Sequence, residues 1–134
     1  GKMSKSNPNG AILLDDPVDV SLNKVKRAQS AFAGEMSESL DSLIKIGKFV
    51  SDESGQREID ELVSKHMNGE GVMKDLKGVI MESLRKYLTD FQEKKSQMSD
   101  SEVLEIAKRG GMIAKKNAKE TIQEARNAVG LKYI

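Results

Sequence analysis

Apolar residues recur at intervals of three and four along most of the chain, which is the period of an amphipathic α-helix. The first such stretch predicts a helix at about 17–29, for which Asp16 would be the N-terminal cap and Pro17 the first helical residue. A second helix is predicted at about 37–51. Its apolar face is marked by Met36, Leu40, Leu43, Ile44 and Gly47.

Two further helices are expected before residue 97. The third carries Ile59 and His66 on its apolar face and ends at Asn68-Gly69, a pair typical of a helix C-terminus. The fourth, at about 72–96, is the longest and should organise the packing, because its apolar stripe is continuous over several turns. The stripe comprises Val72, Leu76, Val79, Ile80, Leu84, Tyr87, Leu88 and Phe91.

The C-terminal part predicts one or two more helices. Ser99 and Glu102 match a capping box, and the helix that follows should break at Gly110-Gly111. A last helix then runs to Gly130, its C-terminal cap. The side chains expected to face the interior of the bundle are those of Ala114, Ala118, Ile122, Ala125 and Val129. The sequence therefore predicts an all-α fold, a bundle of five to six helices without a strand.

The first 16 residues have a different character. A turn-forming cluster at 7–10 precedes an apolar run at 11–14, which predicts a loop followed by a short extended or buried stretch. We expect one domain boundary here, with residues 1–16 as a loop and connector and residues 17–134 as a helical domain.

The composition narrows the chemistry. Lys and Arg number 22 against 21 Asp and Glu, a net charge of +1, so a surface for nucleic acid must be a local patch. The chain has no Cys and one His, so no metal site is expected. No apolar run approaches the length needed to span a bilayer, and the N-terminus does not have the pattern of a signal segment. We therefore expect a cytoplasmic protein without membrane contact.

The pattern that carries the most chemistry is Lys2-Met3-Ser4-Lys5-Ser6. Two lysines three positions apart, spaced by small hydroxyl residues, can approach phosphate groups closely. They can stabilise the negative charge that builds up when a phosphorus–oxygen bond breaks. The alternative is an ordinary solvated terminus in which Lys and Ser alternate.

The residues that follow favour the first interpretation. Residues 2–6 resemble the KMSKS signature of class I aminoacyl-tRNA synthetases, and residues 1–17 resemble the tryptophanyl-tRNA synthetase version of it. In that version a Pro-Asn turn, an apolar run, an acidic residue and a proline lead into a helix with a basic end, here residues 24–28. Asn7 and Gly10 depart conservatively from the family pattern.

Further stretches at 43–46, 67–77 and 111–131 also resemble this family, so the resemblance covers almost the whole chain. Two alternatives stay open. One is a part of a tyrosyl-tRNA synthetase, and the other is a non-catalytic helical module that binds RNA or acts as an adaptor.

The resemblance implies the C-terminal part of an enzyme that activates tryptophan with ATP and Mg²⁺ and transfers it to tRNA. Lys5 would be the main contact to the leaving phosphates and Lys2 a second one. Ser4 and Ser6 would donate hydrogen bonds, and Met3 would belong to the same ATP-binding loop. An α/β nucleotide-binding domain would precede this chain and form the homodimer. The chain by itself is therefore expected to be inactive.

In the resembled family the helical domain recognises the tRNA anticodon. Four cations near the C-terminus have spacings that let them share a helix face, and these are Lys108, Lys115, Lys119 and Arg126. Acidic residues interleave with them and no aromatic side chain lies nearby, so an ordinary solvated face is the alternative. We interpret His66 as a packed residue and not as a catalytic one, because it has no second His or Cys as a partner.

Overall fold

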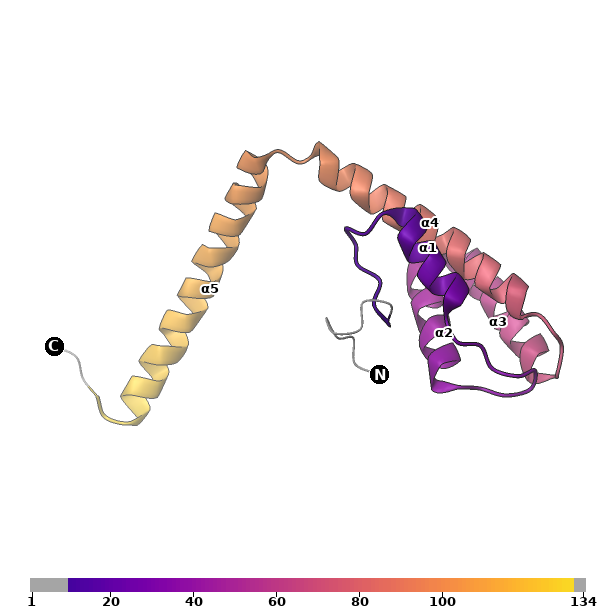
Figure 1. Ribbon diagram of the computed structural model, residues 1–134. Coiled ribbons are helices and arrows are strands. Elements are labelled where there is room, and N and C mark those ends of the chain that lie inside the picture. The colour runs from indigo at the N-terminus through magenta and orange to yellow at the C-terminus, as the bar shows by residue number, and fades with distance from the viewer. Residues whose placement is uncertain (1–9, 132–134) are drawn as a thin grey trace. The chain divides into compact units, whose positions relative to one another are not determined.

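The structure is a computed structural model that describes residues 10–131. This part of the chain contains five helices and no strand, so the predicted all-α fold is confirmed (Figure 1). The helices are α1 (Val18–Arg27), α2 (Glu38–Val50), α3 (Glu53–Met67), α4 (Met73–Gln97) and α5 (Asp100–Ala128). The chain forms two compact units that divide between Lys94 and Lys95, and each is described by itself.

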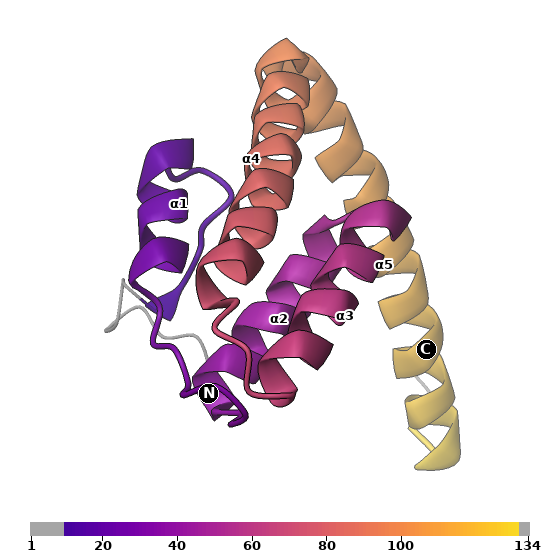
Figure 2. The same cartoon turned by 90° about the vertical axis from the view of Figure 1, so that its right-hand side faces the viewer.

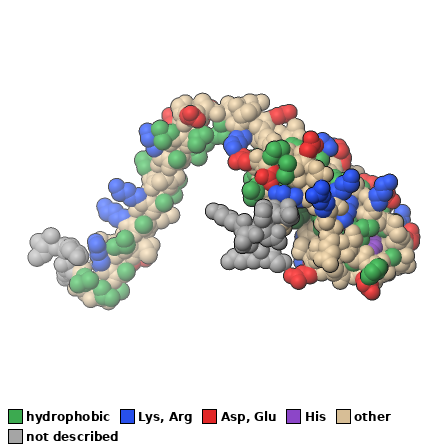
Figure 3. Space-filling model, viewed as in Figure 1, with side chains coloured by type: hydrophobic (Ala, Val, Ile, Leu, Met, Phe, Trp, Pro, Cys, Tyr) green, Lys and Arg blue, Asp and Glu red, His purple; other side chains and the backbone are tan. Residues whose placement is uncertain are grey.

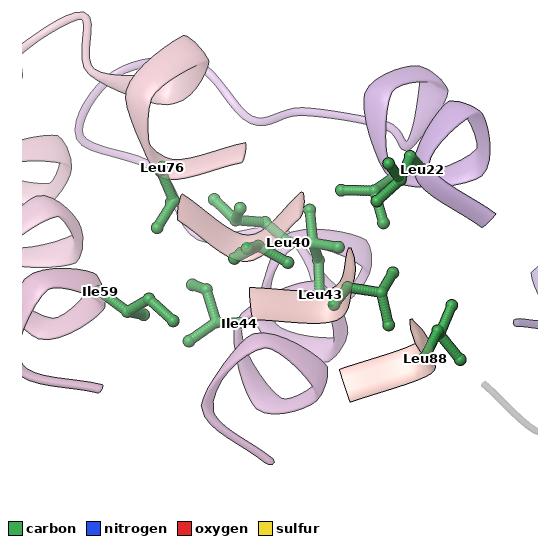
Figure 4. Packing of buried hydrophobic residues seen from close by; sticks show 10 residues of the cluster. Leu22, Leu40, Leu43, Ile44, Ile59, Leu76 and Leu88 are labelled. Carbon is green, nitrogen blue, oxygen red and sulfur yellow. The ribbon is translucent and has the colours of Figure 1, made fainter. Parts of the chain in front are cut away.

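The first unit is built around α4. Four leucine or isoleucine side chains spaced four residues apart form its buried stripe, and these are Leu76, Ile80, Leu84 and Leu88. A spacing of four residues is slightly more than one helical turn, so these side chains lie on one face of the helix. The other core residues are Leu22 and Val25 from α1, Leu40, Leu43 and Ile44 from α2, and Ile59 from α3 (Figure 4). Helices α2 and α3 lie side by side (Figure 2).

A glycine allows α2 and α4 to approach closely. A Cβ atom on Gly47 of α2 would lie 2.6 Å from Cγ1 of Ile80, and Ile80 is fully buried. Gly47 therefore belongs to the packed face of α2, as the sequence pattern predicts.

Local signals at the helix ends are confirmed in several places. Gly69 has a φ of 90°, its N–H donates to the carbonyl of His66, and the N–H of Glu70 donates to the carbonyl of Lys65. This pair of bonds is a Schellman motif, which satisfies the last carbonyls of α3. The predicted capping box of Ser99 and Glu102 is present at the start of α5.

The predicted role of Asp16 as a cap is wrong. Helix α1 begins at Val18, Pro17 occupies the cap position, and no side chain caps the helix. The Asp16 carboxylate instead accepts a hydrogen bond of 2.6 Å from Nζ of Lys24. Both groups in this bond are ionised, so it is stronger than a hydrogen bond between neutral groups.

The predicted break at Gly110-Gly111 is also wrong, because α5 is one continuous helix of 29 residues. Neither glycine has a positive φ. A glycine costs about 1 kcal/mol in a helix interior, which is too little to interrupt a well-capped helix with strong helix formers on both sides. No residue of α5 is buried, and the apolar side chains expected to point inward are exposed.

Two aromatic residues of the α4 stripe also differ from the prediction. Tyr87 is 36% exposed and Phe91 is half-buried, so neither belongs to the core. The ring of Tyr87 contacts the more exposed ring of Phe49 from α2, with 6.1 Å between the ring centroids.

Candidate functional site

The signature residues 2–6 lie outside the described residues. The structure does describe residues 10–16, which join the signature to α1 and which we name the connector. Ile12 of the connector packs against the core of the first unit.

A lysine of α1 holds both ends of the connector. Nζ of Lys24 donates to the carbonyl oxygen of Ala11 at 2.8 Å and to Oδ2 of Asp16 at 2.6 Å. The side chains of Lys24 and Asp16 are both mostly covered. The hydrogen bond from Lys24 lowers the pKa of Asp16 below its ordinary value.

A glutamine of α4 holds the same segment from a second helix. Nε2 of Gln92 donates to the carbonyl oxygens of Leu14 at 2.9 Å and of Asp16 at 3.0 Å. The N–H of Asp16 also donates to the carbonyl of Leu13. The connector is therefore fixed to α1 and α4 by side-chain bonds, although it belongs to no helix.

Sequence reasoning does not identify Lys24 or Gln92 as anchors. Lys24 enters only as part of the basic end of α1, and Gln92 has no distinguishing pattern around it. Both side chains bind backbone carbonyls. Because every residue has a backbone carbonyl, the sequence does not show which residue will be the acceptor.

The single histidine has a structural role. His66 is 2% exposed, and its Nε2 donates to the carbonyl oxygen of Glu35 at 2.8 Å. The carbonyl of His66 accepts from the N–H of Gly34 at 2.7 Å. The interpretation of His66 as a packed residue is confirmed, and its ring ties the loop between α1 and α2 to α3.

Another lysine supports the end of α1. Nζ of Lys77 donates to the carbonyl oxygens of Ala28 at 2.6 Å and Lys26 at 3.3 Å. A cation at these carbonyls satisfies unpaired acceptors and favours the negative end of the helix dipole. Partial burial lowers the pKa of the Lys77 ammonium.

Helix α5 gathers the four proposed tRNA contacts onto one face. Lys115, Lys119 and Arg126 follow Lys108 by 7, 11 and 18 residues, which are close to two, three and five turns. The row is about 27 Å long at 1.5 Å per residue. Lys and Arg side chains stand along α5 in Figure 3, with hydrophobic ones between them. We name these four residues the basic face.

Of the acidic residues that interleave with the basic face in sequence, Glu120 and Glu124 point elsewhere, whereas Glu105 lies three residues before Lys108 and is its neighbour on the helix surface. Glu120 lies about 100° around the helix from Lys119, and it pairs with Lys116 at 3.9 Å. Within the described part of the chain, Lys108, Lys115 and Lys119 form no ion pair. These three lysines of the basic face therefore carry positive charge that no ion pair within residues 10–131 neutralises.

Two other features are absent from residues 10–131. No three His, Asp or Glu side chains are grouped so that they could hold a metal ion. None of the helices in this range has the length and apolar character needed to cross a membrane.

Comparison with known proteins gives one consistent group of relatives. No protein-family model matches the chain, and no solved structure is significantly similar to it. The chain is 34% identical over 137 residues to the tryptophan–tRNA ligase of Helicobacter pylori strain J99 and 32% identical to that of strain 26695. It is 29% identical over 142 residues to the tryptophan–tRNA ligase of Mycoplasma genitalium strain G37.

In each case the similarity covers 97% of this chain. An all-α chain with the KMSKS string and this similarity is homologous to part of an aminoacyl-tRNA synthetase. Within that class its relatives are tryptophan–tRNA ligases, so the resemblance inferred from the sequence is confirmed and the two alternatives are not favoured. The chain spans about 40% of the length of these curated relatives.

Proposed function

We propose that this chain is the C-terminal part of a tryptophan–tRNA ligase, and that the whole enzyme activates tryptophan with ATP and transfers it to tRNA. The observation that carries the proposal is the combination of the KMSKS string at residues 2–6 with similarity to tryptophan–tRNA ligases along 97% of the chain. Homodimer formation through the remainder of the enzyme and a cytoplasmic location stay predictions.

Lys5 has the central role in the proposed mechanism. A carboxylate oxygen of tryptophan attacks the α-phosphorus of ATP, and the bond to pyrophosphate breaks with its electron pair on the leaving oxygen. Lys5 stabilises the charge on that leaving group, Lys2 assists, and the hydroxyls of Ser4 and Ser6 donate hydrogen bonds. Met3 belongs to the same loop.

Mg²⁺ has no proposed ligand in residues 10–131. The acidic side chains of this range do not form a metal site, so they do not fit the ion. It would enter with the phosphate oxygens of ATP.

The test uses the complete protein encoded by the parent reading frame. Lys5→Ala should slow tryptophan-dependent exchange of pyrophosphate into ATP by about 10²–10³-fold, the size expected for a lost contact to transition-state charge. Tryptophan affinity should change little. Lys45→Ala is the control, because Lys45 lies exposed on α2 in an ion pair with Asp41.

Two results would contradict the proposal in different ways. A parent protein without tryptophan-dependent exchange would show that the enzyme is not a tryptophan–tRNA ligase. Normal exchange in Lys5→Ala would remove Lys5 from the mechanism while leaving the function in place. The 134-residue chain by itself should show no exchange.

The basic face of α5 is the proposed contact to tRNA. Cations spaced along one helix face can neutralise successive phosphates, and each neutralised phosphate releases counterions. Helix α5 has no aromatic side chain, so the face would contribute affinity and orientation more than base recognition.

Salt dependence of tRNA binding tests this contact. Replacing Lys108, Lys115 and Lys119 together with Gln should lower the slope of log K against log salt by about 2, which is roughly 0.7 for each lost phosphate contact. The control replaces Lys45, Lys86 and Lys94, each paired with a carboxylate four residues earlier, so that the net charge changes equally. Equal losses in both variants would mean that net charge acts and the basic face is an ordinary solvated surface.

A further inference from the structure

We propose that one end of the first unit is the docking surface for the part of the enzyme that this chain does not contain. This inference rests on the proposed function, because it takes the chain to be the C-terminal part of a longer enzyme. The surface, which we name the docking patch, consists of exposed or half-buried apolar side chains from the connector, α2 and α4. These residues are Leu13, Leu14, Phe49, Tyr87 and Phe91.

The contacts of these residues place them at the same end of the first unit. Nε2 of Gln92 holds the carbonyl of Leu14, and Gln92 directly follows Phe91 on α4. Tyr87 lies about one helical turn before Phe91, and its ring contacts the ring of Phe49. The connector, the end of α2 and the later turns of α4 therefore contribute to one region.

The exposed leucines of the connector are held in fixed positions. Leu13 is 57% exposed, although Ile12 beside it packs against the core. Lys24 and Gln92 bind carbonyls on either side of Leu13. A segment that is already ordered loses less conformational entropy when a partner covers it.

Aromatic residues mark the same region as a surface for a protein partner. None of the four aromatic residues within residues 10–131 belongs to the buried core. Three of them lie in the docking patch, and Phe49 is 77% exposed. Aromatic side chains offer a large apolar area and are enriched in protein interfaces, so covering them is favourable.

The charges beside the patch fit a protein better than RNA. Phosphates attract cations that are not already neutralised. Two lysines here are instead bound to carboxylates at 2.6 and 2.7 Å, in the pairs Asp16–Lys24 and Asp90–Lys94. An apolar area with neutralised charges beside it is typical of the core of a protein interface.

The partner to which we assign the patch is the remainder of the same enzyme. The chain spans about 40% of the length of its curated relatives, so the larger part of each relative lies outside the similarity. Under the proposed function that part precedes residue 1, and the connector leads from it into α1. Because the connector itself forms part of the patch, the two parts of the enzyme meet at this end of the unit.

The opposite end of the first unit provides a control. The loop that contains Phe32 lies at the end of α3, since the N–H of Gly34 donates to the carbonyl of His66. Helix α4 begins near this end at Met73, and Phe91 lies 18 residues further, about 27 Å at 1.5 Å per residue. Phe32 is 82% exposed, but the same partner is not expected to cover it.

The experiment places the photo-reactive residue p-benzoylphenylalanine at Phe49 in the complete enzyme, and at Phe32 in a second protein. Both side chains are exposed aromatic ones, so the probe fits without disturbing the core. After irradiation, the probe at Phe49 should cross-link to peptides that precede residue 1 in the same polypeptide, as mass spectrometry identifies them. The probe at Phe32 should give no such product.

Two substitutions test the apolar character of the patch. Leu13→Asp should lower the yield of the Phe49 cross-link several-fold, because docking would bury an unpaired carboxylate. Met36→Asp adds the same charge at the opposite end, where Met36 is exposed, and should leave the yield unchanged. Equal yields in the two variants would overturn the role of the connector leucines in docking.

The other possible partners give different products. Cross-links from Phe49 to α5, to added tRNA, or to a second copy with a doubled mass would each overturn the proposal, and so would the absence of any cross-link. Pyrophosphate exchange by the same proteins separates the two proposals. An active enzyme without the expected cross-link overturns the docking patch alone, whereas a parent protein without exchange overturns the proposed function and the inference that rests on it.

Discussion

Individual polar side chains hold the loops of the first unit from a long distance along the chain. His66, Lys77 and Gln92 bind carbonyls that lie 31, 49 and 78 positions away, respectively. Each bond satisfies a backbone acceptor outside the helices, which would otherwise need water. The sequence contains the donors but not the geometry that brings a particular carbonyl to them.

Close packing at Gly47 gives a prediction at the residue scale. Gly47→Ala should destabilise the chain by about 1 kcal/mol, because overpacking a buried site costs about 1–3 kcal/mol and Ala gains only about 1 kcal/mol of helix propensity. The new methyl group would lie 2.6 Å from Cγ1 of the buried Ile80 side chain, so that side chain would have to shift within the core. The measurement is the midpoint of urea unfolding followed by circular dichroism.

Gly78→Ala is the control for that substitution. Gly78 is also helical, but a Cβ atom there would meet no other atom within 4 Å. It should therefore stabilise the chain by up to about 1 kcal/mol through propensity alone. Stabilisation of equal size by both substitutions would show that α2 and α4 do not approach closely at Gly47.

The helices themselves follow from short-range signals. The capping box at Ser99, the Asn68-Gly69 stop and the i, i+4 stripe of α4 act within a few residues, so the sequence predicts them correctly. The wrong prediction of a break at Gly110-Gly111 has the same origin. It used only the two glycines and ignored the helix-forming residues on both sides, which keep α5 continuous.

The capping box gives a prediction of pH dependence for α5. Hydrogen bonds from the Ser99 N–H and hydroxyl lower the pKa of Glu102. A lowered folded-state pKa means that the carboxylate stabilises the helix start above its unfolded pKa of about 4.3. That stability is lost as the pH falls through the folded-state pKa. The first turn of α5 should therefore lose helicity in acid.

Carbon-13 NMR of the Glu102 carboxyl group measures this effect directly. Ser99→Ala should raise the pKa of Glu102 towards the ordinary value, and Thr121→Ala at the other end of α5 should leave it unchanged. A pKa of Glu102 that does not respond to Ser99→Ala would contradict the role of the capping box.

At the scale of the whole molecule, the hydrophobic core belongs to one unit. Within residues 10–131, the ten buried apolar residues come from α1 to α4, and no residue of α5 is buried. We therefore expect the chain to keep its fold when residues 98–134 are deleted. The melting temperature should change by less than about 4 °C, which corresponds to roughly 1 kcal/mol for a domain of this size.

Calorimetry and the amide spectrum of the first unit check that prediction. The peaks of the core residues should keep their positions in the shortened chain. Broad loss of these peaks would show that α5 is needed for the fold of α1 to α4.

The sequence by itself determined the first four helices, most of the helix ends and the resemblance carried by residues 2–6. These depend on residues within a few positions of one another, or on a string of side chains whose order is sufficient to identify it. The signature residues lie outside the described part of the chain, so their roles rest on the sequence and its relatives.

Only the tertiary structure decided which faces are buried and where the connector is held. An apolar stripe shows that a helix can pack, but Tyr87 shows that packing also needs a partner surface. Asp16 likewise had two possible partners, and the nearby Lys24 ammonium replaced the helix cap. Burial and bonds to carbonyls depend on segments that folding brings together, and the local pattern of residues does not contain that information.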